Sequence, residues 1–194
     1  IERLLDRSWL YARPDAGAPR FEMLETQRLY AASKLDADAR AVAERAHGIW
    51  YAERVPSPPL RGDPLLRRLS RELDNVVAAA RRAIGRAEVE IAVPTCRLAW
   101  ALLDFAGLPT VGTELAVATL CLPLALAERV QVERILVSAA VMSGDLHAAR
   151  ERLERLVLEA PEEQRTVVYR QLGEVYQRLG RCADARRWFE RALR

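Results

Sequence analysis

Lysine, histidine and cysteine are scarce in this chain. Of its 194 residues, 30 are Lys or Arg, and Lys34 is the only lysine, so arginine carries almost all of the positive charge. The two histidines, His47 and His147, stand alone, and none of the three cysteines has a Cys or His neighbour at a ligand spacing. These cysteines are Cys96, Cys121 and Cys182. Their positions indicate neither a zinc site nor a disulfide framework and favour a reducing, cytoplasmic location.

The motifs of several enzyme classes are also missing. The sequence has no G-x-x-x-x-G-K loop followed by Ser or Thr, and no serine lies in a G-x-S-x-G frame. His47 lies beside the apolar Ile49 and Trp50, and His147 follows Gly144 near the start of an expected helix, so we interpret both as structural or surface residues. We therefore predict that this chain has no catalytic residues, no metal site and no bound cofactor, and that it is not an enzyme.

Neither the net charge nor the longest apolar run indicates a nucleic acid or a membrane. The formal net charge is only +3, which does not require a polyanionic partner. The run Leu115–Ala127 is shorter than the roughly 20 residues of a membrane span and contains Pro123. We predict a buried helix there and no membrane association. The sequence opens at Ile1 without a basic and apolar leader, so we expect no signal peptide and interpret the chain as part of a longer protein.

The first 35 residues predict a β-hairpin followed by a helix. A short helical end up to about residue 6 precedes the candidate strand SWLYA, the turn-forming cluster RPDAGAP and a second candidate strand, RFEML. Thr26 is expected to cap the helix that follows, in which Leu29, Tyr30 and Leu35 form an apolar stripe.

Helices account for the rest of the sequence. We expect one helix over Asp36–Arg54, a Pro-rich elbow up to residue 63, and a helix that starts with Pro64 and ends at Gly85 as its C-cap. Beyond it, glycines at 107, 144 and 180 punctuate the helical segments at intervals of 37 and 36 residues. Such spacing is typical of helix-hairpin repeats. The predicted fold is mainly α, with a linker over 36–63 and an antiparallel helix-hairpin superhelix over 64–194.

The last hairpin carries the most specific motif, TVVYRQLGEVYQRLGRCADARRWFERAL. Gly173 and Ala185 are small enough for two helices to approach closely, while Tyr176 and Phe189 fill the space beside them. The segment resembles a tetratricopeptide repeat, a helix hairpin of about 34 residues. The positions that match the signature of that family are Tyr169, Leu172, Gly173, Tyr176, Ala185, Phe189 and Ala192.

Two earlier segments repeat this pattern. A shift of 36 positions aligns residues 130–161 with the last hairpin, although Val137 replaces the close-packing glycine. Residues 87–127 form a degenerate third hairpin, with Gly107 at the turn and Gly112 at the small-residue position, and with Pro94 and Pro123 disturbing its helices. The equivalent residues of the middle hairpin are Leu136, Ala140, Gly144, Ala149, Leu153, Leu156 and Pro161.

In repeats of this kind the first helices of the hairpins line a concave groove. The resemblance implies that a protein or peptide partner, or a small inducer, binds in that groove. The groove positions are Gln131, Arg134, Ser138, Val141 and Met142 in the middle hairpin and Val167, Arg170, Glu174, Gln177 and Arg178 in the last. The alternative is that these side chains only form a solvated face. Because the chain stops at Arg194, before the proline that closes a repeat, we expect further repeats beyond it.

The front of the chain resembles a second family. The runs LLDRSWL and RFEMLETQRLYAASKL are similar to the end of the winged-helix domain of bacterial STAND-class regulators, which are signal-transduction ATPases with an NB-ARC-like core. The matching residues are Arg20, Phe21, Leu24, Glu25, Thr26, Arg28, Tyr30 and Ala31, whereas Gln27 and Leu29 depart from the family run. A further family run, E-x-D-N-L-R-A-A-L, is matched by Glu72, Asp74, Asn75, Val76, Ala78 and Ala79.

The resemblance implies a winged-helix end over residues 1–35 and a sensor domain over 64–194 in a regulator of transcription. The sensor would transmit the binding of an inducer or partner, by intramolecular contact, to an upstream core, and ATP or ADP would bind only in that core. Direct DNA binding is not expected of such a sensor. Two alternatives stay open: a stand-alone repeat scaffold that binds a peptide or protein, and nucleic-acid binding through the strip Arg7, Arg13, Arg20 and Arg28.

Overall fold

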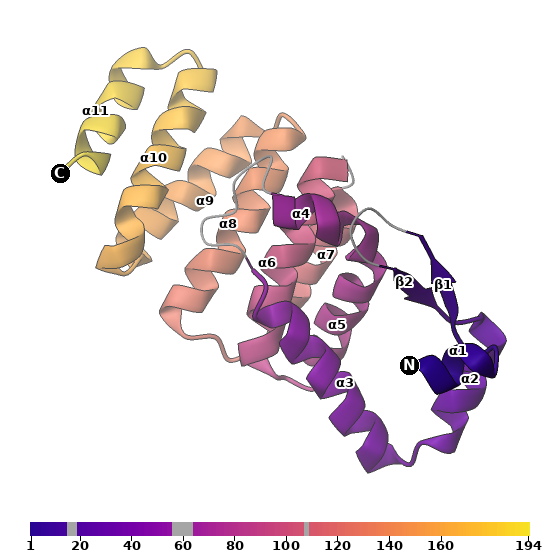
Figure 1. Cartoon of the computed structure of the whole chain (residues 1–194). Helices are drawn as coiled ribbons and strands as arrows, with labels where there is room; N and C mark the ends of the chain where they lie inside the picture. The colour runs from indigo at the N-terminus through magenta and orange to yellow at the C-terminus, as the bar shows by residue number, and fades with distance from the viewer. Residues whose placement is uncertain (15–18, 56–63, 107–108) are drawn as a thin grey trace. The chain divides into compact units, whose positions relative to one another are not determined.

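The structure, a computed structural model, describes residues 1–14, 19–55, 64–106 and 109–194 (Figure 1). The chain is mainly helical and contains a small two-stranded antiparallel sheet, which confirms the mainly α fold class. It divides into two compact units, Ile1–Arg45 and Ala46–Arg194. The predicted hairpin tip, the Pro-rich elbow and the turn at Gly107 lie outside the described residues.

The first unit holds the β-hairpin. Its elements are α1 (Glu2–Asp6), β1 (Tyr11–Arg13), β2 (Arg20–Glu22), α2 (Glu25–Lys34) and the start of α3 (Ala37–Ala52). Strands β1 and β2 pair antiparallel, with Ala12 opposite Phe21. The predicted strands and the helix after them are therefore confirmed, although each strand is shorter than expected.

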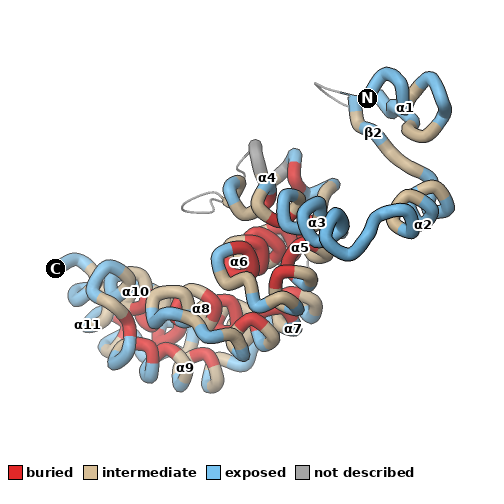
Figure 2. The backbone as a smooth tube through the Cα atoms, turned by 90° about the horizontal axis from the view of Figure 1, so that it is seen from below, coloured by how far each residue is buried: buried red, intermediate tan, exposed pale blue. Residues whose placement is uncertain are grey.

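None of the described residues of this first unit is buried (Figure 2). Leu24, Leu29 and Tyr30, in and beside α2, are 51%, 57% and 52% exposed. Isolated exposed apolar residues are normal, but a folded domain usually buries several of its large ones. The described part of Ile1–Arg45 therefore has no hydrophobic core of its own.

The expected N-cap of α2 was wrong. The helix begins at Glu25, its N-cap is Leu24, and no side chain caps it, so Thr26 lies inside the first turn. This earlier start places the Glu25 carboxylate at the positive end of the helix dipole. Glu25 also accepts a hydrogen bond of 2.8 Å from Nε of Arg28, one turn later.

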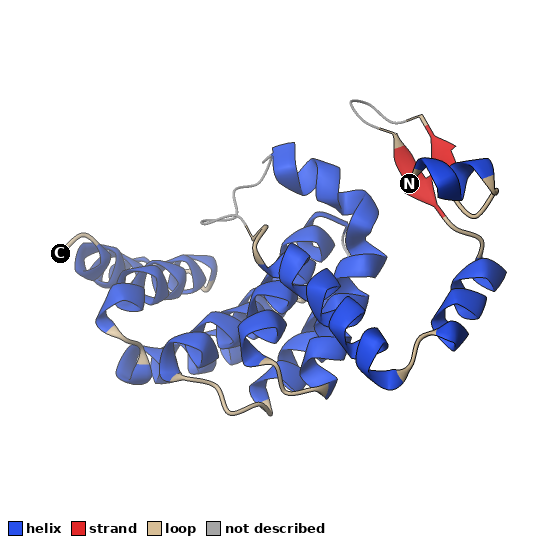
Figure 3. Ribbon diagram, turned by 60° about the horizontal axis from the view of Figure 1, so that its bottom comes forward, coloured by secondary structure: helices blue, strands red, loops and turns tan. Residues whose placement is uncertain are grey.

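The second unit is a succession of helices, and from α5 (Leu73–Gly85) onwards each helix contacts the next (Figure 3). After the end of α3 come α4 (Pro64–Leu69), the 3₁₀ turn η1 (Ser70–Glu72), α5 (Leu73–Gly85), α6 (Val89–Ala106), α7 (Pro109–Leu120), α8 (Leu126–Met142), α9 (Leu146–Glu159), α10 (Glu162–Arg178) and α11 (Cys182–Ala192). Helix α8 also contacts α6 and α10. These three first helices of successive hairpins therefore lie side by side.

The predicted helix from Pro64 to Gly85 is interrupted. Its two ends are confirmed, but η1 separates α4 from α5. At this turn Leu69 is buried, and the Glu72 carboxylate accepts a hydrogen bond of 3.2 Å from the Tyr51 hydroxyl. The tighter 3₁₀ geometry thus accompanies contacts to a remote part of the chain, which the local sequence does not specify.

Three local expectations about helix boundaries were also wrong. Gly85 is the last residue of α5 rather than its cap, and the positive φ of 55° belongs to Ala87. Pro94 does not end α6, because it lies near the start of the helix, where the removal of one backbone N–H costs least. The apolar run Leu115–Ala127 is not one buried helix, since α7 ends at Leu120 and a turn precedes α8.

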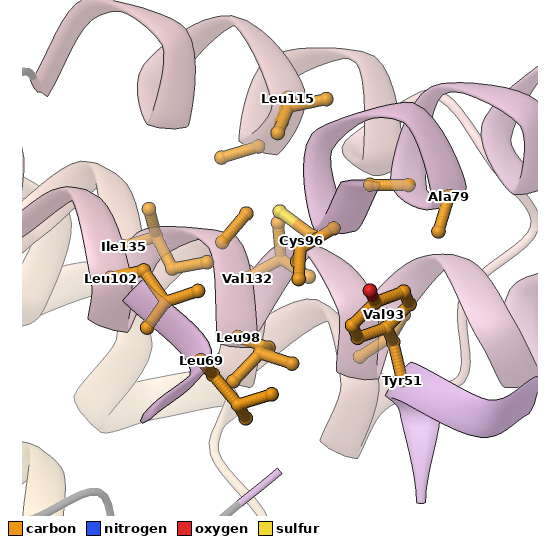
Figure 4. Close-up of a cluster of buried hydrophobic side chains, with 14 of the residues drawn as sticks. Tyr51, Leu69, Ala79, Val93, Cys96, Leu98, Leu102, Leu115, Val132 and Ile135 are labelled. Carbon is orange, nitrogen blue, oxygen red and sulfur yellow. The ribbon is translucent and has the colours of Figure 1, made fainter. Parts of the chain in front are cut away.

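Two large hydrophobic clusters form most of the core of the second unit, and a third, small cluster consists of Ala83, Ile91 and Ala92. The larger of the two includes Cys96 and Leu102 and joins the end of α3 and helices α4 to α8 (Figure 4). The smaller includes Leu172 and joins α8 to α11. Helix α8 contributes to both, with Ile135 in the first and Val137 in the second. This helix is therefore a wall shared by the two clusters.

Two glycines allow helices to approach closely inside the hairpins. A Cβ atom added at Gly173 of α10 would lie 2.7 Å from Cε1 of Phe189 in α11. One added at Gly112 of α7 would lie 2.5 Å from Cε3 of Trp100 in α6. Both distances are well below normal carbon contacts of about 3.5–4.0 Å. The small-residue role predicted for these two glycines is therefore confirmed.

Two other glycines make the turns within the last two hairpins. Gly144 and Gly180 have φ values of +82° and +74°, a left-handed conformation that favours glycine. Gly144 separates α8 from α9, and Gly180 separates α10 from α11. Their predicted positions at hairpin turns are confirmed.

Candidate binding surface on helices α6, α8 and α10

The accessible sides of α6, α8 and α10 form one surface, which we call the groove face. On α6 the accessible stripe is narrow and includes Pro94, Arg97 and Ala101, which recur at helical spacing. Most other described residues of this helix are buried. Because α8 contacts both α6 and α10, side chains on the three helices can meet.

The ten predicted groove residues lie on α8 and α10. Gln131, Arg134, Ser138, Val141, Val167 and Glu174 are half-buried, whereas Met142, Arg170, Gln177 and Arg178 are exposed. Val141 packs against the smaller core cluster, so it contributes to the core as well. Nη1 of Arg170 and Oε1 of Glu174 are 3.0 Å apart in an exposed ion pair along α10, an arrangement that contributes little to stability.

Two hydrogen bonds join neighbouring hairpins, each between residues one position away from the 36-residue shift that aligns the hairpins. Nε of Arg134 in α8 donates to Oε1 of Gln171 in α10 at 2.7 Å, and the two residues are 37 positions apart. Nε2 of Gln164 donates to the carbonyl oxygen of Ala127 at 3.0 Å, again across 37 positions. Residues about one repeat apart in the sequence therefore lie next to each other in the structure. Gln164 and Gln171 were missed, although the shift that aligns the hairpins would have placed them beside α8.

Arg97 is a second residue that the sequence analysis missed. It lies on α6, half-buried, and burial lowers the pKa of its guanidinium. The pKa of Arg134 is lowered to about 10, mainly by burial and to a smaller extent by the positive charges of Arg97 and Arg170. Arg134 is therefore close enough to both arginines to be repelled by them. A search for arginines at the repeat spacing would have found all three.

A surface pocket lies away from the predicted groove residues, between α8 and α9. Its lining residues are Arg129, Glu133, Arg152, Arg155, Leu156 and Glu159. Nη1 of Arg152 and Oε2 of Glu133 are 2.9 Å apart within it. Because basic and acidic side chains alternate in the lining, the pocket does not select a ligand of either charge.

The other residues considered from the sequence are dispersed. His147 is exposed near the start of α9, and His47 packs edge-on against Tyr51 at 5.1 Å between ring centroids. Glu162 and Glu163 occupy the first turn of α10, where the helix dipole favours carboxylates. Within the described residues, no group of three or more His, Cys, Asp or Glu side chains could hold a metal ion. No helix in that part of the chain is long and apolar enough to cross a membrane.

The groove face thus combines half-buried arginines on α6 and α8 with exposed polar side chains on α10. Such a surface can bind an extended ligand that spans several helices, because each helix offers one or two side chains at similar heights. Comparisons of the chain with protein-family models, with curated proteins and with solved structures found no match.

Proposed function

We propose that this chain is the sensor and protein-interaction region of a STAND-type signal-transduction ATPase that regulates transcription. Its hairpins would be tetratricopeptide-like, and an inducer or partner would bind on the groove face. The observation that carries the proposal is the hydrogen bond between Arg134, a predicted groove residue on α8, and Gln171 on α10, which joins two successive hairpins. A ligand on this face would contact α8 and α10 together.

The exposed apolar residues of Ile1–Arg45 support the proposal that this segment is the end of a winged-helix domain, which belongs to the STAND-type regulator. Leu24, Leu29 and Tyr30 would complete the core of a winged-helix domain if another part of that domain covered them. The hairpin of β1 and β2 would be the wing, and α2 the helix by which the chain leaves that domain. This element would connect the sensor to the nucleotide-bound core.

The switching step follows from the stacking of the hairpins. A ligand changes an equilibrium only by its different affinities for two states. A partner that touches α6, α8 and α10 at once would favour one mutual arrangement of these helices over others. The change would then reach the nucleotide-bound core as an altered contact with the sensor.

The arginine strip of the first unit gives less support to DNA binding. Nε of Arg13 and Oε2 of Glu22 are 2.9 Å apart, and Arg28 is paired with Glu25. These carboxylates reduce the positive potential that phosphates would require. The stand-alone scaffold is the more relevant alternative, because Ala46–Arg194 has its own core.

Two experiments test the proposal. The coding sequence upstream of Ile1 should encode a phosphate-binding loop within about 250–300 residues, the length of one or two domains, whereas a start codon immediately before Ile1 would contradict the STAND assignment. Affinity capture with the full-length protein should lose its partner when Arg170→Ala and Arg178→Ala are introduced. A suitable control is Arg187→Ala on α11, since that side chain is 78% exposed and lies outside the predicted groove. Unchanged capture by both groove variants would remove the groove as the binding surface.

A further inference from the structure

Three arginines occupy equivalent places on the groove face. Arg97, Arg134 and Arg170 lie on α6, α8 and α10, and they are 37 and 36 positions apart. We call this set the arginine row. Helix α8 contacts both α6 and α10, and Arg134 donates a hydrogen bond to Gln171, the residue after Arg170. The charges of Arg97 and Arg170 also act on Arg134, in agreement with this placement.

Most of the charge in the arginine row is uncompensated. Arg97 makes no hydrogen bond or ion pair within the described part of the chain, and the partner of Arg134 is the neutral amide of Gln171. Arg170 alone is paired with a carboxylate, that of Glu174. A half-buried charge without a counter-charge is unfavourable, and the two such charges of Arg97 and Arg134 repel each other.

Comparable arginines elsewhere in the chain are paired with carboxylates. The Arg152 side chain is 34% exposed and lies 2.9 Å from a Glu133 oxygen. The Arg86 side chain is 29% exposed and lies 3.3 Å from a Glu88 oxygen. Arg97 and Arg134 depart from this pattern, so an anion from outside the described chain would supply the missing partner.

Arg134 is held in a position suited to such an anion. Gln171 accepts from Nε of Arg134, which fixes the side chain without neutralising it. Neither Nη atom donates a hydrogen bond within the described residues, and neither is a buried unsatisfied atom, so both remain accessible to a ligand. The paired N–H groups of a guanidinium match the two oxygens of a carboxylate.

We propose that the arginine row binds an acidic peptide segment that has a carboxylate at every third residue. This inference rests on the groove of the proposed function and specifies its ligand. Packed helices lie about 8–10 Å apart. In a polyproline II segment, residues i and i+3 point to the same side about 9 Å apart, because the helix has three residues per turn and rises about 3.1 Å per residue. A β-strand, with its period of two, presents such residues on opposite sides.

A peptide fits this face better than a nucleic acid does. Glu174 beside Arg170 would repel a continuous polyanion. Carboxylates separated by two neutral residues can meet the arginines and avoid this glutamate. The small net charge of +3 agrees with a partner of local rather than uniform negative charge.

The test uses the 194-residue chain and fluorescein-labelled peptides in an anisotropy titration. The first peptide repeats Glu-Pro-Ala three times, and the second has the same composition with its three glutamates adjacent. We expect the first to bind at least ten-fold more tightly at low salt and to lose most of its affinity in high salt. Equal affinity for the two peptides would overturn the proposed spacing, and tighter binding of a DNA oligonucleotide of equal length would overturn the choice of a peptide.

Variants connect this binding to the arginine row. Arg97→Gln and Arg134→Gln should each weaken binding of the first peptide by about ten-fold, as loss of a charge-assisted hydrogen bond predicts. The control Arg186→Gln, on α11 with a side chain that is 82% exposed, should bind normally. Since Arg134→Gln also removes the contact with Gln171, circular dichroism must show an unchanged fold. If the fold of Arg134→Gln is changed, the test depends on Arg97→Gln, because Arg97 makes no such contact that the substitution could remove.

The inference and the proposed function can fail separately. If Arg170→Ala abolishes capture of the natural partner and the repeating peptide does not bind, the groove is retained and the acidic-peptide assignment falls. If the repeating peptide binds through Arg97 and Arg134 but capture of the natural partner is unchanged in the groove variants, the proposed sensor role falls and the acidic-peptide site stands.

Discussion

The close approach at Gly173 predicts that Gly173→Ala destabilises the protein. Helix propensity alone would predict that the same substitution stabilises it, so the sign of the stability change distinguishes the two effects. In Gly173→Ala the new Cβ would lie 2.7, 2.8 and 3.0 Å from Cε1, Cδ1 and Cζ of Phe189. Normal carbon contacts are about 3.5–4.0 Å, so the ring or the helix must move by close to 1 Å. Overpacking of this kind destabilises by about 1–3 kcal/mol. Alanine gains about 1 kcal/mol over glycine inside a helix. The net expectation is a loss of about 1 kcal/mol.

Gly85 provides the matched control. It is also helical, as the last residue of α5, but no heavy atom lies within 4 Å of a Cβ built there. Gly85→Ala should therefore be neutral or stabilise the protein by up to about 1 kcal/mol. Urea unfolding followed by far-ultraviolet circular dichroism compares the two variants through their midpoints, and hydrogen exchange locates the effect in α10 and α11 for Gly173→Ala.

A double-mutant cycle isolates the contact itself. Phe189→Ala removes the ring and destabilises the last hairpin by less than the about 3–5 kcal/mol of a fully buried phenylalanine, because Phe189 is half-buried. In that background Gly173→Ala should change sign and stabilise by about 1 kcal/mol, since only helix propensity remains. If Gly173→Ala were equally stabilising in both backgrounds, the steric reasoning about Gly173 and Phe189 would be refuted.

Three further predictions concern other parts of the second unit. Burial raises the pKa of Cys96 from 9.0 to about 11, although its hydrogen bond to Thr119 acts in the opposite sense. Stability should therefore be complete below pH 9 and fall by about 3 kcal/mol as the pH rises from about 9 to 11, a loss that chemical unfolding should not show in Cys96→Ala. Tyr176→Phe removes a 2.6 Å hydrogen bond from the hydroxyl to Oε1 of Glu154, and urea unfolding should show a loss of about 1–2 kcal/mol; no loss would mean that water replaces this bond. Gly180→Ala should lower stability by about 1–2 kcal/mol through its φ of +74° alone, because no atom lies within 4 Å of the new Cβ, and Gly180→Asn should recover part of the loss.

Features set by local chemistry could be predicted from the sequence. The turns at Gly144 and Gly180 follow from a conformation that glycine favours, and the start of α4 at Pro64 follows from the missing N–H of proline. The close approach at Gly173 was also predictable, because a small residue opposite a large one repeats a known packing solution.

Features set by distant contacts could not be predicted in this way. The 3₁₀ turn at Ser70–Glu72 accompanies the contact between Glu72 and Tyr51, which are far apart in sequence. Arg97 was missed because its neighbours on α6 are mostly buried and apolar, so the segment does not look like a ligand surface. Only the contact of α6 with α8 identifies Arg97 as the neighbour of Arg134.

Helix α8 belongs to both large hydrophobic clusters, so it couples the unfolding of the two halves of the unit. In a linear array each hairpin is stabilised mainly by its nearest neighbours, so unfolding can proceed from one end. The helix that carries Ile135 and Val137 on its two sides couples the halves of the unit, since neither cluster can open without exposing one side of it. A ligand bound at Arg134 would tighten that junction, and it would slow hydrogen exchange in α6 and α10 alike, including in amides that the ligand never touches.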